Sequence, residues 1–266
     1  RDHDISINSL EYAWPGLLVI DNDRLNVDWS TERLGTNTRA YFDELQASHW
    51  HAIVPTFPAV YVGTHLFEEL ADRGWMIMDA EGDAMCFTGS KHTGGQDYGL
   101  LDLTYKDAYN FWRDKHQQLL EYGQSLKTTT SIFELLDEAC GRHNEEGALL
   151  RTLYPTLMEQ SLYESVSSTT TPPEGVVVHD QINVASQRRP YLELAPFESS
   201  WAGLNQLYRM LISIQNSSVP FVKHMIGRAG DEPMSADLYL RWLALSTFSG
   251  NFSFHAEVEH LPIHYD

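Results

Sequence analysis

Short apolar runs alternate along this chain with segments of helical periodicity, and this alternation limits the fold more than any other feature. Residues 16–20, 52–55 and 175–178 are apolar runs typical of buried strands. Helices are predicted near residues 41–45, 64–73, 106–122, 148–165 and 201–214. Strands that alternate with helices form a parallel sheet covered by helices, so an α/β protein is predicted.

The last of these helices has an expected buried face. It carries apolar side chains at helical spacing, which are Leu204, Leu207, Tyr208 and Leu211.

The chain length points to one barrel-sized domain. With 266 residues, 42% of them hydrophobic, the chain can bury one large core, and a (β/α)8 barrel typically has about 250 residues. Only about six or seven strands can be placed by pattern, fewer than a closed barrel needs. We therefore predict a single domain of barrel size over residues 1–266. Either it has strands that the pattern does not show, or the barrel is incomplete within this chain. An incomplete barrel would belong to a longer polypeptide, or be completed by a companion chain or by self-association, because proteins normally cover an open sheet edge.

The net charge limits the possible partners. The formal charge is −19, which repels nucleic acid and anionic membranes and is compatible with a neutral ligand such as a sugar. No apolar run approaches the ~18 residues of a membrane span.

Neither a cofactor nor a metal is expected. Cys86 and Cys140 form at most one disulfide and lack the paired spacing of a zinc site, so the redox compartment stays open. The 12 histidines include no i, i+4 pair with a carboxylate base.

Three late segments resemble one family of enzymes. Residues 225–230 (MIGRAG), 237–242 (DLYLRW) and 248–255 (FSGNFSFH) are similar, in this order, to the DIGGFxG, ELYxRW and FxPxFRxH patterns of late barrel strands in glycoside hydrolase family 31. Earlier, residues 87–89, 102–106 and 111–112 resemble its WPG, DFTNP and WW patterns. The resemblance runs from about Leu17 to His255. It implies a TIM barrel and α-glycoside chemistry, and it favours a secreted or secretory-pathway location.

The residues that carry the family's chemistry are replaced. The resemblance places the nucleophile position on Thr130 or Ser131, and counting back from Trp201 places the general acid on Pro196. A neutral alcohol lacks the charge that captures an oxocarbenium-like centre, and proline has no proton to transfer. A family carboxylate has become Met225, and other replaced positions fall on Phe57, Asp180, Glu193 and Ser253.

We therefore interpret the chain as a degenerate α-glycosidase-like barrel, a pseudoenzyme that binds carbohydrate or acts as a structural or interaction module. Two alternatives stay open. The chain could be an active α-glycoside hydrolase with displaced carboxylates, for which Asp180, Glu193 and Glu198 are the candidates, or a subunit completed by a companion chain. For Glu193 and Glu198 the competing interpretation is solvated loop charge.

Several other residues are candidates for sugar contacts. The resemblance assigns possible ligand binding to Asp21, Asp23, Arg241, Trp242, Phe252 and His255. Asp21 and Asp23 could instead satisfy loop amides, and His255 could be a core histidine. One of the seven tryptophans could be a sugar-stacking surface, but sequence does not select the exposed one.

Overall fold

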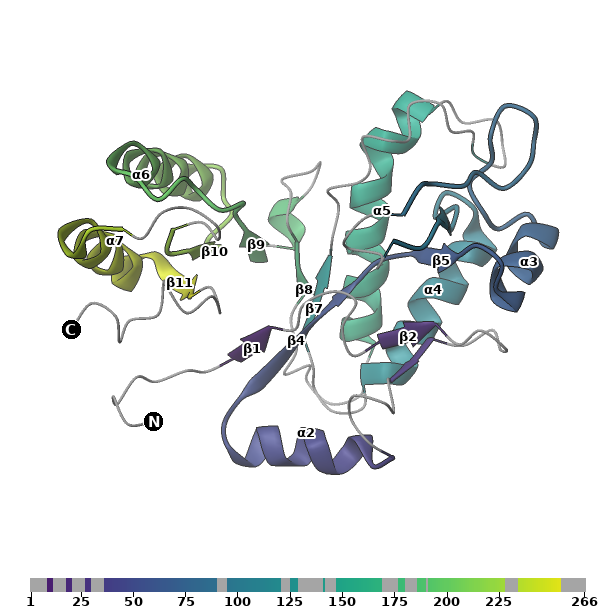
Figure 1. Ribbon diagram of the computed structural model, residues 1–266, viewed down its shortest axis with the longest axis horizontal. Coiled ribbons are helices and arrows are strands. Elements are labelled where there is room, and N and C mark those ends of the chain that lie inside the picture. The colour runs from purple at the N-terminus through teal and green to yellow at the C-terminus, as the bar shows by residue number, and fades with distance from the viewer. Residues whose placement is uncertain are drawn as a thin grey trace. The chain divides into compact units, whose positions relative to one another are not determined.

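The structure of the protein is a computed structural model (Figure 1). It describes residues 9–11, 18–20, 27–29, 36–89, 95–120, 125–128, 141, 147–168, 177–179, 186–189, 191–227 and 234–254. The chain divides into two compact units. We call Ile7–Val177 the first unit, and Val178–Asp266 with Arg1–Ser6 the second unit.

The first unit contains strands β1, β4 and β7 of a four-stranded sheet with the order β1-β4-β7-β8, in which β4 pairs in parallel with β1 and β7. The strands of this sheet are β1 (Ser9–Glu11), β4 (His51–Thr56), β7 (Ser125–Thr128) and β8 (Val177–Val178). The division between the units falls within β8, after Val177. Two antiparallel pairs accompany the sheet, β2 (Leu18–Ile20) with β3 (Val27–Trp29) and β5 (Ala59–Tyr61) with β6 (Tyr98–Leu100).

The four helices predicted for this unit are confirmed. They are α2 (Thr38–Ala47), α3 (His65–Asp72), α4 (Lys106–Leu119) and α5 (Gly147–Ser167). Two of them begin at side-chain caps, because Asn37 accepts a hydrogen bond from the Ala40 amide and Thr64 accepts one from the Phe67 amide.

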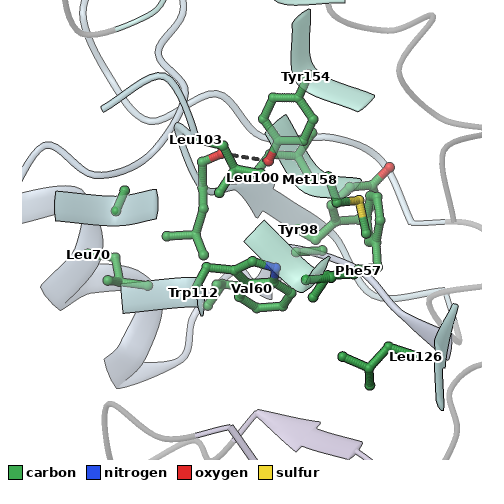
Figure 2. Packing of buried hydrophobic residues seen from close by; sticks show 14 of the residues in the cluster. Phe57, Val60, Leu70, Tyr98, Leu100, Leu103, Trp112, Leu126, Tyr154 and Met158 are labelled. Carbon is green, nitrogen blue, oxygen red and sulfur yellow. Dashed lines mark hydrogen bonds between the residues drawn. The ribbon is translucent and has the colours of Figure 1, made fainter. Parts of the chain in front are cut away.

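Large buried side chains form the core of the first unit (Figure 2). Trp112 of α4 and Tyr154 of α5 are almost completely buried there. The Tyr154 hydroxyl donates a hydrogen bond of 2.6 Å to the carbonyl of Leu101. Burial raises the pKa of Tyr154 well above its usual value, and the charge of Asp102 adds to this, so the hydroxyl stays a donor. This bond ties α5 to the segment after β6.

The second unit contains a three-stranded parallel sheet with the order β11-β10-β9. Its elements are η4 (Ser186–Arg188), β9 (Tyr191–Glu193), α6 (Trp201–Asn216), β10 (Phe221–Met225), α7 (Ala236–Ser249) and β11 (Gly250–Ser253). Helices α6 and α7 lie beside each other next to this sheet (Figure 1). Leu207 and Leu211 of α6 and Trp242 of α7 share one buried cluster with Leu192 of β9 and Val222 of β10.

The buried face of α6 differs in part from the prediction. The helix buries Gly203, Leu207, Leu211 and Ile214. Tyr208 is instead 51% exposed. It follows Leu207 by one residue, which corresponds to about 100° around the helix axis, and this turns its ring away from the sheet.

Residues 237–242, which resemble part of a late barrel strand, form a helix, so this prediction was wrong. The amide of Leu238 donates to the Ser235 hydroxyl at 3.4 Å, which caps the start of α7. Gly250 ends the helix at a φ of 89°, a conformation that favours glycine. Only the following residues, Gly250–Ser253, form a strand, β11.

The run at residues 16–20 is not a strand of the parallel sheet. Leu18–Ile20 pairs antiparallel with Val27–Trp29, and the first parallel strand described is Ser9–Glu11. A short apolar run does not reveal its pairing partner, which is why the pattern misled.

Candidate functional site

The sheet of the second unit has one apolar face and one polar face. Leu192, Val222 and Phe252 pack into the cluster formed with α6 and α7. Side chains alternate between the faces of a strand, so the residues between these lie on the opposite face. We call that set the polar face; it consists of Tyr191, Glu193, Phe221, Lys223, Met225, Asn251 and Ser253. Its one aromatic hydrocarbon ring, Phe221 at the start of β10, is exposed and stacks on Tyr191.

An ion pair lies at the centre of the polar face. Glu193, Lys223 and Asn251 are register neighbours across the three strands. The Lys223 Nζ atom lies 3.1 Å from Glu193 Oε2, and the two side chains are only 4% and 5% exposed. A buried carboxylate needs such a partner, because burying an unpaired charge is very costly. The interpretation of Glu193 as solvated loop charge was therefore wrong.

Toward the amino end of the strands the polar face continues with Tyr191. The Asn251 side-chain amide donates a hydrogen bond to the Tyr191 hydroxyl, which links β11 to β9 across β10. Burial raises the pKa of Tyr191, and the neighbouring Glu193 charge raises it further. The phenol therefore stays neutral at physiological pH.

At the carboxyl ends of the strands the polar face carries Met225 and Ser253, which are register neighbours. The Ser253 hydroxyl oxygen is buried and has no hydrogen-bond partner among the described residues. Pro196, three residues beyond β9, is exposed, as is Glu198. Exposure of Glu198 agrees with the solvated interpretation of that residue.

One charged residue of the polar face was missed by sequence reasoning. Lys223 lies in the middle of β10, between Val222 and His224, and all three are buried. Lysine is almost never fully buried unless it is paired. A single lysine inside an apolar strand was therefore the sequence signal for a buried carboxylate partner, although it could not identify Glu193 as that partner.

Three proposed sugar-contacting residues lie on the other side of this sheet. Trp242 is completely buried in the core, and Phe252 packs against that same cluster. Arg241 lies on the exposed side of α7, with its Nε atom 3.4 Å from Asp237 Oδ1. Trp242 and Phe252 thus hold α7 against the sheet; their predicted contacts with sugar stay predictions.

His224 connects β10 of this sheet to α7. Its Nε2 atom lies 2.8 Å from the Ser249 hydroxyl, and burial lowers its pKa. The serine hydroxyl is also within 2.8 Å of the Ser246 carbonyl. This histidine is on the helix side of the sheet, so it connects elements and does not belong to the polar face.

In the first unit, the ends of β4 and β7 are buried against helices. Thr56 and Thr128 are register neighbours and both are buried. The Thr56 hydroxyl lies 2.6 Å from His116 Nε2, and His116 Nδ1 lies 2.9 Å from the Trp112 carbonyl. A carbonyl only accepts, so Nδ1 carries the proton and Nε2 accepts from Thr56. Phe57, which the resemblance places at a family aspartate, is a core residue that packs edge-on against Tyr98.

The remaining predicted site residues lie outside the described part of the chain. They are Asp21, Asp23, Thr130, Ser131, Asp180 and His255. Strand β2, which precedes Asp21, belongs to an antiparallel pair and not to the parallel sheet.

Among the described residues, no group of three or more histidine, cysteine or acidic side chains could hold a metal ion. No helix within those residues has the length and apolar character needed to cross a membrane.

Comparison with protein families matches residues 3–265 to the domain described as "Glycosyl hydrolases family 31 TIM-barrel domain". The chain belongs to glycosyl hydrolase family 31. The predicted family and the TIM-barrel fold class are thereby confirmed. No curated protein matches the chain. The prediction that residues 1–266 form one domain stays a prediction.

Solved family 31 structures share the fold at low sequence identity. A sulfoquinovosidase from E. rectale superposes with a TM-score of 0.75 at 16% identity, over 93% of this chain and 38% of its own. A Flavobacterium johnsoniae dextranase complexed with glucose superposes with a TM-score of 0.75 at 15% identity, over 97% of this chain and 33% of its own. The chain thus spans well under half of these relatives, which agrees with a barrel that is incomplete within the chain.

Proposed function

We propose that this family 31 barrel does not hydrolyse glycosides and that it binds carbohydrate without chemical change. The observation that carries the proposal is the buried ion pair of Glu193. Glu193 is the one buried carboxylate of the described second unit, and Lys223 holds it at 3.1 Å. A carboxylate whose negative charge faces a buried ammonium group is a poor nucleophile and is not free to meet a substrate.

The neighbouring positions support the same conclusion. Retaining glycosidases need two carboxyl groups about 5 Å apart, one to attack and one to protonate the leaving oxygen. Near the strand ends the resemblance places Pro196 at the general-acid position, Met225 at the position of a further family carboxylate and Ser253 at that of a family arginine. None of these side chains titrates in the range where enzymes work.

Carbohydrate is the ligand class that family membership favours. Solved relatives are complexed with glucose and with isomaltose. Both are neutral, which suits a chain with a formal charge of −19.

The test is hydrolysis of a panel of aryl α-glycosides by the purified chain between pH 4 and 8, beside calorimetric titration with isomaltose and glucose. We expect heat of binding without release of the aryl group. Turnover that is abolished by Glu198→Gln or Asp180→Asn would overturn the proposal.

A second candidate function is hydrolysis by displaced carboxylates. The exposed position of Glu198, five residues beyond the end of β9, favours it, because an exposed carboxylate is free to meet a substrate. Asp180 and Glu193 are the other candidates. If activity exists and survives Gln or Asn substitution at all three positions, this candidate is excluded.

A third candidate function is that of a subunit completed by a companion chain. The motivation is that the chain spans only 38% and 33% of the two relatives described above. Such a companion could supply the missing carboxylates, and co-purification from the natural source would identify it.

A further inference from the structure

The structure selects one exposed tryptophan. Five of the seven tryptophans have described side chains, which are Trp50, Trp75, Trp112, Trp201 and Trp242. Trp112 and Trp242 are 1% and 0% exposed, whereas Trp201 is 53% exposed. Trp50 and Trp75 are intermediate. The half-exposed ring of Trp201 stands at the start of α6.

Trp201 begins a stripe along α6. Asn205, Tyr208 and Ile212 follow at i+4, i+7 and i+11, a spacing that places all four residues on one side of a helix. Tyr208 is 51% and Ile212 43% exposed. Seven residues of helix separate the two aromatic residues by about 10.5 Å along the axis. This span exceeds the width of one pyranose ring.

The stripe also differs in charge from the rest of the protein. The chain has 37 acidic residues, yet α6 contains none, and Arg209 is its only charged residue. An acidic ligand would meet the repulsion of the whole chain, and a strongly cationic one would find no carboxylate on α6. Exposed rings with a neutral amide between them suit a neutral ligand that has apolar faces and hydroxyl edges.

We propose that the α6 stripe, formed by Trp201, Asn205, Tyr208 and Ile212, is a binding site for a neutral oligosaccharide. The C–H faces of two sugar rings pack on Trp201 and Tyr208, and Asn205 hydrogen-bonds to hydroxyls between them. This site deepens the proposed function and rests on it, since it locates the carbohydrate on the outside of α6. It is separate from the polar face of the sheet.

The test is calorimetric titration of the full chain with glucose, isomaltose and longer isomaltooligosaccharides. We expect affinity to rise with chain length, because a monosaccharide reaches only one ring. Trp201→Ala and Tyr208→Ala should each weaken binding of the longer sugars on the order of tenfold, as loss of an aromatic contact does. Tyr208→Phe, which keeps the ring, should bind as the unmodified chain does.

Met210→Ala is the matched control, because Met210 is 41% exposed on α6 but lies outside the stripe. Binding should not change in this variant, and circular dichroism of each variant checks that α6 still folds. If sugars bind equally well after both aromatic substitutions, the stripe is not the site, although carbohydrate binding itself stands. If no sugar binds, both the stripe and carbohydrate binding are excluded.

The other occupant to test for is a second copy of this chain. Light scattering over a range of concentrations distinguishes self-association through the stripe from sugar binding. Self-association that Trp201→Ala abolishes would overturn the proposal and make the stripe an interface between copies of the chain. If the masses of the unmodified chain and of Trp201→Ala both stay constant with concentration, the sugar site is supported.

Discussion

At the scale of single residues, His116 contributes to how stability depends on pH. Burial lowers its pKa from 6.5 to about 4, although the hydrogen bond to the Trp112 carbonyl opposes this shift. The unfolded chain therefore takes up a proton at a higher pH than the folded chain does. Stability due to neutral His116 is fully present above pH 6.5 and is lost as the pH falls toward 4.

We expect this residue to lower the free energy of unfolding by up to about 3 kcal/mol between pH 7 and pH 4. Urea unfolding of the wild-type protein and of His116→Gln across this range measures the difference. Glutamine does not titrate, so the variant should be less stable at pH 7 but lose less stability on acidification. Parallel pH profiles for the two proteins would contradict the assignment.

The buried ion pair of Glu193 and Lys223 gives a second prediction at this scale. Lys223→Met leaves Glu193 buried without its partner, which should cost about 3–5 kcal/mol of stability. The double variant Glu193→Leu with Lys223→Met should recover most of this loss, because no lone charge remains. Urea unfolding of the two single variants and the double variant gives the coupling energy.

The pair of Arg241 and Asp237 is the matched control, since both side chains are 66% exposed. Arg241→Ala should change stability by less than about 1 kcal/mol, because water screens an exposed ion pair. Equal losses from Lys223→Met and Arg241→Ala would mean that the buried pair is not desolvated in solution.

At the scale of secondary-structure elements, α6 depends on its first turn. The Ser200 hydroxyl accepts a hydrogen bond of 3.1 Å from the Gly203 amide. Gly203 itself has no room for a side chain, because a Cβ atom there would collide with the Glu198 carbonyl. The start of this helix is therefore fixed by both a cap and a close backbone contact.

Ser200→Ala should lower the stability of the second unit by about 1 kcal/mol, whereas Ser200→Gly should cost only a few tenths. The reason is that glycine leaves the amides of the first turn accessible to water, while alanine neither caps nor exposes them. Denaturant midpoints of the two variants measure this difference. If alanine and glycine are equally harmless, the cap does not hold α6 in place.

At the scale of the whole molecule, the number of paired strands bears on assembly. The described residues contribute seven strands to the two larger sheets, β1-β4-β7-β8 and β11-β10-β9, whereas a closed barrel of this fold has eight. An unpaired strand edge tends to recruit another strand, so a barrel that lacks its eighth strand should form a native particle heavier than one chain.

Sedimentation or light scattering of the protein from its natural source tests this expectation. A mass above 30.4 kDa would fit self-association, a companion chain or a longer polypeptide, and a denaturing gel separates these cases. A single species of 30.4 kDa would show that the chain needs no further strand.

Much of the fold was predictable because it depends on local pattern. Helices α2, α3, α4, α5 and α6 lie where apolar spacing predicted them, and the order of the motifs was enough to indicate family 31. The helix α7 was missed, although Ser235 and Gly250 are the cap residues that mark its ends. There the family resemblance outweighed local signals that were visible in the sequence.

The sequence by itself determined the family and the alternation of strands and helices, and it is the basis for the prediction that the catalytic residues are replaced. The tertiary structure alone decided that Glu193 is buried against Lys223, that Trp242 lies in the core while Trp201 is exposed, and that Leu18–Ile20 pairs outside the parallel sheet. The physical reason is how far apart in the chain the interacting residues lie. Helical spacing and caps act within a few residues, whereas burial and strand pairing depend on segments far apart in the chain, such as Glu193 and Lys223, which are 30 positions apart.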